Sequence, residues 1–356
     1  MRDLAAERGI RAVLVTPGPD LRYLVGYDAV PLERLTCLVV RVDADPVLVV
    51  PELELLAAAA SPVGEAGLDV LTWGETDDPY AKVAGLVGST GEVAVDNHMW
   101  AEKVLRLRDA GAGARQVLAG QLLDQLRIRK EPDEIAALAD AGAAIDRVHA
   151  AVTGLLRPGR TEAQVGAEIA ELILEAGHVR VDFVIVASGP NGASPHHEVS
   201  DRVIMPGDAV VVDIGGTMPD GYRSDCTRTY AVGDPGPDFR ARYEILQASQ
   251  EAGVRAARVG ARCSDVDTAS RSVLADAGLG ELFIHRTGHG IGLESHEEPY
   301  IVQGNDLPLE PGMAFSVEPG FYEAGRHGAR IEDIVVVTEG DPRVLNTQTR
   351  ALVVIE

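Results

Sequence analysis

The last two-thirds of the chain repeat one order of helix and turn signals at a nearly constant offset. Gly159 precedes a helix that Thr161 is expected to cap, and Gly260, 101 residues later, precedes a helix that Ser264 is expected to cap. Three later pairs keep a similar offset of 100 to 105 residues: Gly177 and Gly278, His196 and His296, Pro206 and Pro311. Such self-similarity predicts two similar halves that face each other and form a site between them.

Each half carries an acidic residue inside an apolar strand, at Asp213 and at Glu318. A buried charge costs several kcal/mol unless something compensates it. The turn at 219–221 predicts a hairpin in which Asp213 lies directly opposite Asp225, and a turn near Gly325 places Glu332 opposite Glu318. Two opposed carboxylates repel unless a cation lies between them.

Two such acid pairs concentrate four negative charges, which two divalent cations with bridging carboxylates would neutralise. Aspartic-protease chemistry is the rival use of paired acids, but it shares one proton between two carboxylates and does not need four. His289 lies in the glycine-rich segment 287–292 and adds one nitrogen donor. This donor set favours manganese, with cobalt or zinc possible, over a closed structural zinc site.

With these residues the second domain resembles the pita-bread metallopeptidase family, in its Xaa-Pro branch of prolidase and aminopeptidase P. The motifs that carry the resemblance are VVVDIG at 210–215, SDCTRT at 224–229, TGHGIG at 287–292, VEPG at 317–320 and RIED at 330–333. The resemblance implies that Asp213 holds one ion and that His289 and Glu318 hold the other. It also implies that Asp225 and Glu332 bridge the two ions.

The same resemblance implies the reaction, in which a metal-bridging hydroxide attacks the carbonyl of the Xaa-Pro bond while Glu318 assists proton transfer. His296 is implied to steady the tetrahedral intermediate, and His196 to be a second catalytic histidine. His285 and Arg330 match positions that the family uses to bind substrate. Short proline-containing peptides are therefore the expected partners, with dipeptides slightly favoured because Arg330 is a candidate to meet a free carboxylate.

The first domain, expected over residues 1–120, alternates apolar strands with helices and is predicted to be α/β. Residues 18–27, GPDLRYLVGY, resemble the creatinase-type N-terminal domain of this branch. That resemblance argues against a methionine aminopeptidase and implies a homodimer. The second domain, residues 121–356, is predicted to be a duplicated α+β pita-bread catalytic domain that begins with a long helix after Glu131. His149 falls on the apolar stripe of this helix, as a core histidine would.

The composition argues against some classes of binding partner. The 32 basic and 55 acidic residues give a formal net charge of −23, which disfavours nucleic acid and anionic membrane surfaces. No apolar run is long enough for a membrane span, and the charged N-terminus is unlike a signal peptide. The three cysteines suggest no disulfide framework, so a cytoplasmic protein is expected.

The sequence is also compatible with two other hypotheses about function. A metal-dependent amide hydrolase of the same fold, similar to ectoine hydrolase, would use the same ligands on a different C–N bond. Creatinase-like chemistry works without the metals, so the complete ligand set counts against it. A catalytically dead binding module on this fold would have no need of either the full ligand set or the histidines.

Overall fold

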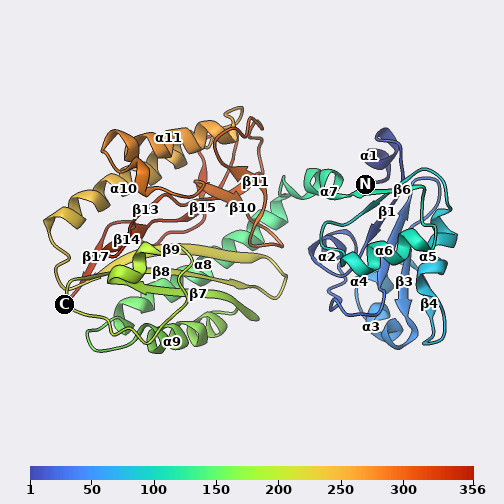
Figure 1. Cartoon of the computed structure of the whole chain (residues 1–356), viewed down its shortest axis with the longest axis horizontal. Coiled ribbons are helices and arrows are strands. Elements are labelled where there is room, and N and C mark those ends of the chain that lie inside the picture. The colour runs from blue at the N-terminus through green and yellow to red at the C-terminus, as the bar shows by residue number, and fades with distance from the viewer. The chain divides into compact units, whose positions relative to one another are not determined.

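The computed structural model describes all residues from 1 to 356, which form two compact units, Met1–Arg127 and Ile128–Glu356 (Figure 1). The boundary expected near residue 120 coincides with the start of helix α7 (Gly120–Arg127). Leu122 and Leu123 of this helix pack into the core of the first unit, so the division lies at the end of α7. No helix combines the length and the apolar character that a membrane span requires.

The first unit is built on a six-stranded mixed sheet in the order β4-β3-β2-β1-β5-β6. Its strands are β1 (Ile10–Val15), β2 (Cys37–Arg41), β3 (Val47–Pro51), β4 (Asp69–Trp73), β5 (Glu92–Val95) and β6 (Arg115–Leu118). Besides α7, its helices are α1 (Arg2–Glu7), α2 (Pro19–Val25), α3 (Leu55–Ala59), α4 (Pro62–Glu65), α5 (Pro79–Val87) and α6 (Ala101–Asp109), with a 3₁₀ turn at Glu52–Glu54. Strands β2 and β3 pair antiparallel, while β5 and β6 pair parallel.

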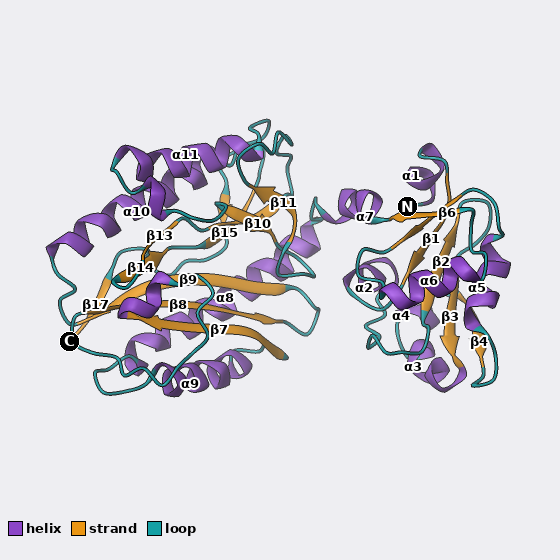
Figure 2. Cartoon of the chain, viewed as in Figure 1, coloured by secondary structure: helices purple, strands orange, loops and turns teal.

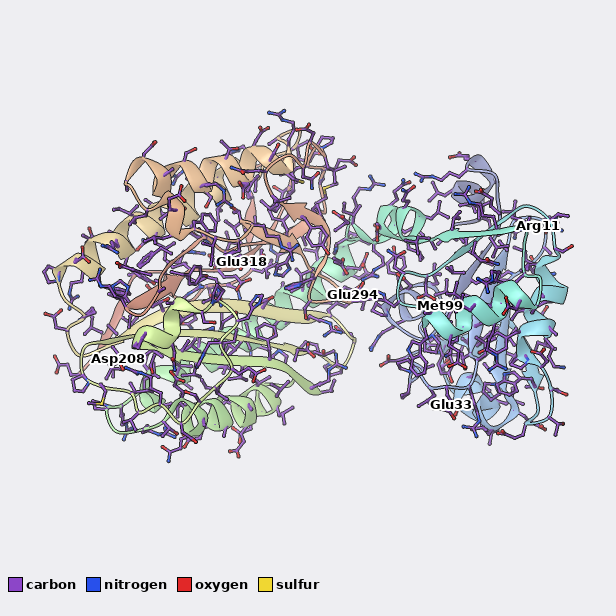
Figure 3. All side chains as sticks on the ribbon, viewed as in Figure 1. Arg11, Glu33, Met99, Asp208, Glu294 and Glu318 are labelled. Atoms are coloured by element: carbon purple, nitrogen blue, oxygen red, sulfur yellow. The ribbon has the colours of Figure 1, made fainter.

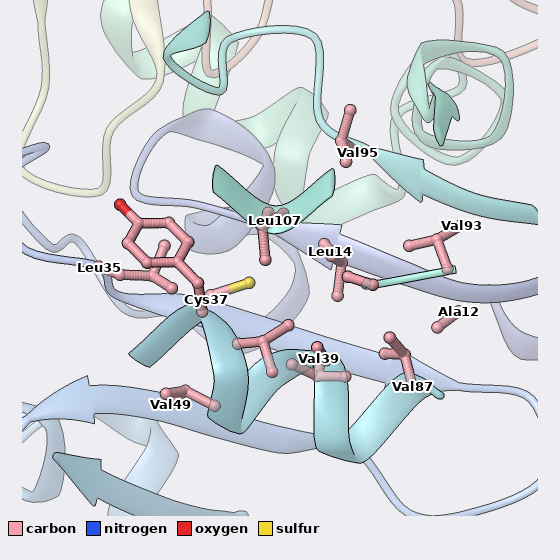
Figure 4. Packing of buried hydrophobic residues seen from close by; sticks show 14 of the residues in the cluster. Ala12, Leu14, Leu35, Cys37, Val39, Val49, Val87, Val93, Val95 and Leu107 are labelled. Carbon is pink, nitrogen blue, oxygen red and sulfur yellow. The ribbon is translucent and has the colours of Figure 1, made fainter. Parts of the chain in front are cut away.

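Both faces of this sheet are buried, because alternate residues of one strand point to opposite sides. On β1, Ala12 and Leu14 pack beneath α5 and α6, in the cluster that Figure 4 shows. Val13 and Val15 pack on the other side, against α1, α2, α3, α4 and α7. The predicted α/β class of the N-terminal domain is confirmed.

The second unit contains three sheets and four long helices (Figure 2). One sheet has the order β17-β9-β8-β7, another β11-β10-β12-β15-β16, and β13 pairs with β14 alone. Its strands are β7 (Arg180–Ser188), β8 (Asp208–Thr217), β9 (Arg223–Val232), β10 (Gly288–Gly290), β11 (Glu297–Ile301), β12 (Ala314–Val317), β13 (Gly320–Glu323), β14 (His327–Arg330), β15 (Asp333–Val336), β16 (Arg343–Val344) and β17 (Val353–Ile355). Its helices are α8 (Pro132–Leu155), α9 (Glu162–Glu175), α10 (Pro237–Ala256) and α11 (Cys263–Asp276), with 3₁₀ turns at Gly189–Ala193 and Gly280–Leu282. In Figure 1, α10 and α11 lie above the strands and α9 lies below them.

Matching hydrogen bonds support the internal duplication. The N–H of Gly159 donates to Ile204 at 3.0 Å, and the N–H of Gly260 donates to Leu309 at 2.9 Å. Thr161 caps α9 as expected, but the cap of α11 is Arg262 and not Ser264. The side chain of Asp265 completes that capping box, and Arg262 lies 101 residues after Thr161, so the repeat offset holds at the cap itself.

The predicted register of the first hairpin is wrong by two residues. Asp213 of β8 pairs with Thr227, and Asp225 of β9 pairs with Gly215. The reason is that the turn is centred on Asp220, where the N–H of Gly221 donates to Met218 and the N–H of Met218 donates to Tyr222. A shift of two residues keeps a side chain on the same face, so the two acids are diagonal neighbours instead of direct partners.

The second hairpin keeps its expected register. Val317 pairs with Asp333, and Gly320 pairs with Arg330, so Glu318 and Glu332 lie opposite each other between these two ladders. The connecting turn contains Gly325 at φ +77°, a left-handed conformation that glycine adopts without strain.

His149 of α8 is a core residue, as expected. Its ring is buried, with Nδ1 3.0 Å from the hydroxyl of Tyr230 and Nε2 3.0 Å from the carbonyl oxygen of Cys226. Burial lowers the pKa of His149 to about 3, and the nearby Arg228 guanidinium acts in the same direction. The folded protein therefore holds this ring neutral at pH values where the unfolded chain, with a pKa near 6.5, binds a proton.

Because the folded pKa is the lower one, the stability from His149 is complete above about pH 6.5 and is lost as the pH falls toward 3. We expect His149→Gln to flatten the acid side of the stability profile by up to about 1.4 kcal/mol per pH unit. Urea unfolding between pH 7.5 and 5, with a chelator present, measures the difference. His98→Gln, at an exposed position, is the matched control. Parallel profiles for wild type and His149→Gln would contradict this account.

Candidate metal centre and active site

A single cavity of about 630 Å³ in the second unit gathers all the residues expected to form the site. They come from β8, β9, β10 and β14, from the residues that directly follow β12 and β14, and from three loops. Figure 3 labels Glu318 in the interior of this unit. The cavity is lined by Phe183, Val184, Ile185, Pro195, His196, His197, Glu198, Val199, Asp213, Asp225, His285, Arg286, His289, His296, Glu318, Arg330 and Glu332.

The five expected metal ligands lie close together. Donor atoms of Asp225, His289 and Glu332 are all within 4.8 Å of one another, and all three residues are buried. Nε2 of His289 is 3.3 Å from Oε1 of Glu318 and 3.7 Å from Oδ2 of Asp225. The two halves of the duplicated unit thus bring their acids to one place.

Burial and mutual repulsion raise the pKa of three of these acids. Burial, with the charge of Asp213 added, holds the pKa of Asp225 well above its usual range. Burial and the neighbouring Asp225 raise the pKa of Glu332 in the same way. Burial raises the pKa of Glu318 to about 7, against the opposing effect of Arg330. The site therefore disfavours its own negative charges unless further positive charge is present.

His289 presents its ligand nitrogen to the acids. Its Nδ1 is 3.1 Å from the carbonyl oxygen of Gly290. Because that oxygen can only accept, Nδ1 carries the hydrogen and Nε2 keeps its lone pair free for a metal. Burial lowers the pKa of His289 to about 3, with the charge of His296 acting in the same direction. A neutral imidazole that turns Nε2 toward carboxylates is the form that binds a metal.

Arg330 is the one cation bonded directly to an acid of the site. Its Nη2 donates to Oδ2 of Asp213 at 2.6 Å, its Nη1 to the hydroxyl of Tyr322 at 2.8 Å and its Nε to Thr227 at 3.0 Å. Thr227 in turn donates to Oε2 of Glu332 at 2.7 Å. Arg330 is buried, and each of its three guanidinium nitrogens donates a hydrogen bond. Its side chain therefore serves as a partner for the acids of the site.

The three histidines expected around the substrate differ in their surroundings. His196 and His296 are exposed to the cavity and form no hydrogen bond within the protein, so both can donate to a ligand. The ring of His296 lies against that of His289, with centroids 3.9 Å apart. His285 is less free, because its Nε2 is 2.9 Å from the hydroxyl of Tyr322.

Sequence reasoning missed two residues, one on the cavity wall and one that is hydrogen-bonded to residues of that wall. Arg286 lines the cavity, forms no ion pair with a carboxylate, and stacks on Tyr300 with its Cζ 4.3 Å from the ring centroid. Tyr322 connects Arg330 to His285 through its hydroxyl. Arg286 could have been noticed from its place three residues before His289, but a single basic residue in a loop is a weak signal.

The residues fit a pair of divalent ions. Oδ1 of Asp213 is buried and has no hydrogen-bond partner, which is costly for a carboxylate oxygen unless a cation binds it. Four carboxylates and one neutral imidazole line the same cavity, and one guanidinium, that of Arg330, is bonded directly to an acid among them. Oxygen donors with a single nitrogen suit a divalent ion such as manganese.

Comparison with known proteins identifies both parts of the chain. Residues 136–339 match the model of metallopeptidase family M24, and residues 1–129 match the creatinase/prolidase N-terminal domain. The chain is 53% identical to a probable dipeptidase PepE of Mycobacterium tuberculosis, over 98% of this chain and 93% of that one. It is 37% identical to an Xaa-Pro dipeptidase of Lactobacillus helveticus, over 90% of this chain and 88% of that one.

Solved structures agree with this assignment. The crystal structure of dipeptidase PepE from Mycobacterium ulcerans has a TM-score of 0.95 and 54% identity, and the match covers 99% of this chain and 95% of that one. A prolidase from Pyrococcus furiosus has a TM-score of 0.89 and 30% identity, with 98% and 100% covered. The predicted pita-bread fold behind a creatinase-type domain is therefore confirmed, and the chain belongs to metallopeptidase family M24.

Proposed function

We propose that this metallopeptidase is a two-metal-dependent exopeptidase that hydrolyses the Xaa-Pro peptide bond and prefers dipeptides. The observation that carries the proposal is the ligand set of four acids and one histidine at the cavity. Relatives that match almost the whole chain are named dipeptidase or Xaa-Pro dipeptidase, which supports the substrate class.

Asp213 would hold one ion, and His289 and Glu318 the other. Asp225 and Glu332 would bridge the two ions. Manganese is the metal that we propose, with cobalt or zinc as alternatives. When bound, the metal pair would lower the pKa of the attacking water and so make it a nucleophile near neutral pH.

The chain's own side chains then handle the proton and the developing charge. Glu318, which lines the cavity, would accept a proton from the attacking water and pass it to the leaving nitrogen. His296 lines the cavity and would donate to the oxygen that becomes negative in the transition state. His196, on the loop 194–200, is the second donor to the substrate.

The preference for dipeptides needs a cation that is free to meet the C-terminal carboxylate. Arg330 was the expected candidate, but its guanidinium is already bonded to Asp213, Thr227 and Tyr322. Arg286 is on the cavity wall without an acidic partner. We therefore propose that Arg286 binds the C-terminal carboxylate of the substrate. Arg330 and His285 then support the substrate side of the metal centre.

We expect the manganese form to cleave Xaa-Pro dipeptides much faster than Xaa-Ala dipeptides. The prolyl nitrogen has no hydrogen, whereas alanine would bury an unpaired N–H at a cost of about 1–3 kcal/mol, or about 5- to 150-fold in kcat/KM. Xaa-Pro-Xaa peptides should be cleaved more slowly than Xaa-Pro if Arg286 binds the free carboxylate. Kinetics with a matched peptide series measure both ratios.

Equal cleavage of Xaa-Ala would contradict the proline preference. Cleavage of no peptide, together with hydrolysis of a small cyclic amidine or an acetylated amine, would favour the amide hydrolase instead. Intact metal binding with no hydrolysis of any of these compounds would favour the binding module.

We expect His296→Ala to lower kcat by about 10²–10³ while the protein keeps its metals, because a donor to developing charge acts mainly in the transition state. His289→Ala is the matched comparison, since it removes a proposed ligand and should lose metal together with activity. Metal analysis and steady-state kinetics of both variants check the assignment. Loss of metal from His296→Ala, with an active and metal-loaded His289→Ala, would reverse the two roles.

A further inference from the structure

One wall of the cavity is a single loop. Five successive residues, 195–199, line the cavity, and His196 is among them. The loop follows the 3₁₀ turn Gly189–Ala193 and has no regular secondary structure of its own. A loop without a ladder of backbone hydrogen bonds needs other contacts to hold a side chain in a fixed place.

Glu162, in the first turn of α9, provides these contacts from behind the loop. Its side chain is completely buried. Oε1 accepts hydrogen bonds from the N–H of Ser188 at 2.7 Å and from its hydroxyl at 2.6 Å. Oε2 accepts from the hydroxyl of Ser200 at 2.6 Å, and Nδ2 of Asn191 lies 3.1 Å from both oxygens.

His197 binds the same carboxylate. Its Nε2 is 2.9 Å from Oε2 of Glu162, and because a carboxylate can only accept, this nitrogen carries the hydrogen. Ser188 precedes the 3₁₀ turn that leads into the loop, Ser200 is at the end of the loop, and His197 is within it. One carboxylate therefore fixes both ends of the segment and the residue next to His196. Such a satisfied network explains how a charge can remain buried there.

The second repeat shows that helix packing does not require an acid at this place. The residue 101 positions after Glu162 is Cys263, which is also fully buried at the start of α11. The backbone of both helix starts bonds to the following segment in the same way, from Ala163 to Ser200 and from Ser264 to Asn305. The repeat thus folds with an uncharged residue, and the acid is specific to the half that carries His196.

We propose that Glu162 is a positioning residue that holds the loop 194–200 so that His196 and the adjoining wall meet the substrate. It touches no ligand of the metal centre and acts through the loop. This inference rests on the proposed Xaa-Pro peptidase function, because it gives the loop a substrate to position.

The test is a double-mutant cycle with Glu162→Gln and His196→Ala on an Xaa-Pro dipeptide. Gln keeps the size of the side chain but turns an amide N–H₂ toward donors, so at least one bond is lost. We expect Glu162→Gln to lower kcat/KM about 10- to 100-fold, mainly through KM, with metal content unchanged. In the His196→Ala background the same change should cost less than about threefold, because the residue acts through that loop.

The same factor in both backgrounds, or no loss in Glu162→Gln, would overturn the proposal. Loss of metal from Glu162→Gln would overturn it as well, since the residue would then support the centre directly. Glu171→Gln is the matched control, because Glu171 is on the same helix and exposed. If Glu162→Gln does not fold, Ser200→Ala removes one of the bonds and should shift KM in the same direction by a smaller factor.

Hydrogen exchange separates this inference from the proposed function, since it needs no substrate. In Glu162→Gln, backbone amides of residues 189–200 should exchange at least tenfold faster than in wild type, while Glu171→Gln leaves them unchanged. Faster exchange without Xaa-Pro activity in wild type would mean that the function is wrong and the loop support is right. Unchanged exchange in that segment would overturn the positioning role, whatever the activity.

Discussion

The main physical constraint on the second unit is the repulsion among four carboxylates that its fold brings together. Asp213 and Asp225 come from one hairpin, and Glu318 and Glu332 from the other. One guanidinium, that of Arg330, offsets part of this charge, and one oxygen of Asp213 is left without any partner. Bringing like charges into a buried place is unfavourable by several kcal/mol unless cations bind there. We therefore expect metal binding to stabilise the folded form of this unit.

Duplication explains how the acids reach one place, and the differences between the repeats explain how the site becomes asymmetric. A buried ion pair between Arg228 on β9 and Asp333 on β15, 2.7 Å apart, joins the two halves next to Glu332. Nη1 of Arg228 also donates to the carbonyl oxygen of Glu332 at 2.6 Å, which fixes the backbone of a proposed bridging residue. Where one repeat has the buried Glu162 behind a cavity-lining loop, the other has Cys263.

Much of this could be predicted from sequence, because an acid in an apolar strand stands out and glycine turns set hairpin positions. The opposition of Glu318 and Glu332 followed from the turn at Gly325. The register of the other hairpin was wrong, since a Pro-Asp-Gly segment does not reveal which residue is central. The support of the loop by Glu162 could not be found in this way, because it depends on contacts 26 to 38 residues apart in the sequence, for which one chain carries no local pattern. Arg286 lies only three residues before His289, but its lack of an acidic partner is visible only in the structure.

Metal stoichiometry tests the central claim most directly. Mass spectrometry of the desalted, manganese-loaded protein counts ions per chain, in wild type and in Asp225→Asn. If the four acids form a two-ion centre with Asp225 as a bridge, wild type should hold two ions and the variant should lose both, because each ion loses a ligand. An active wild-type protein with one ion or none, or a variant that keeps two, would contradict the account.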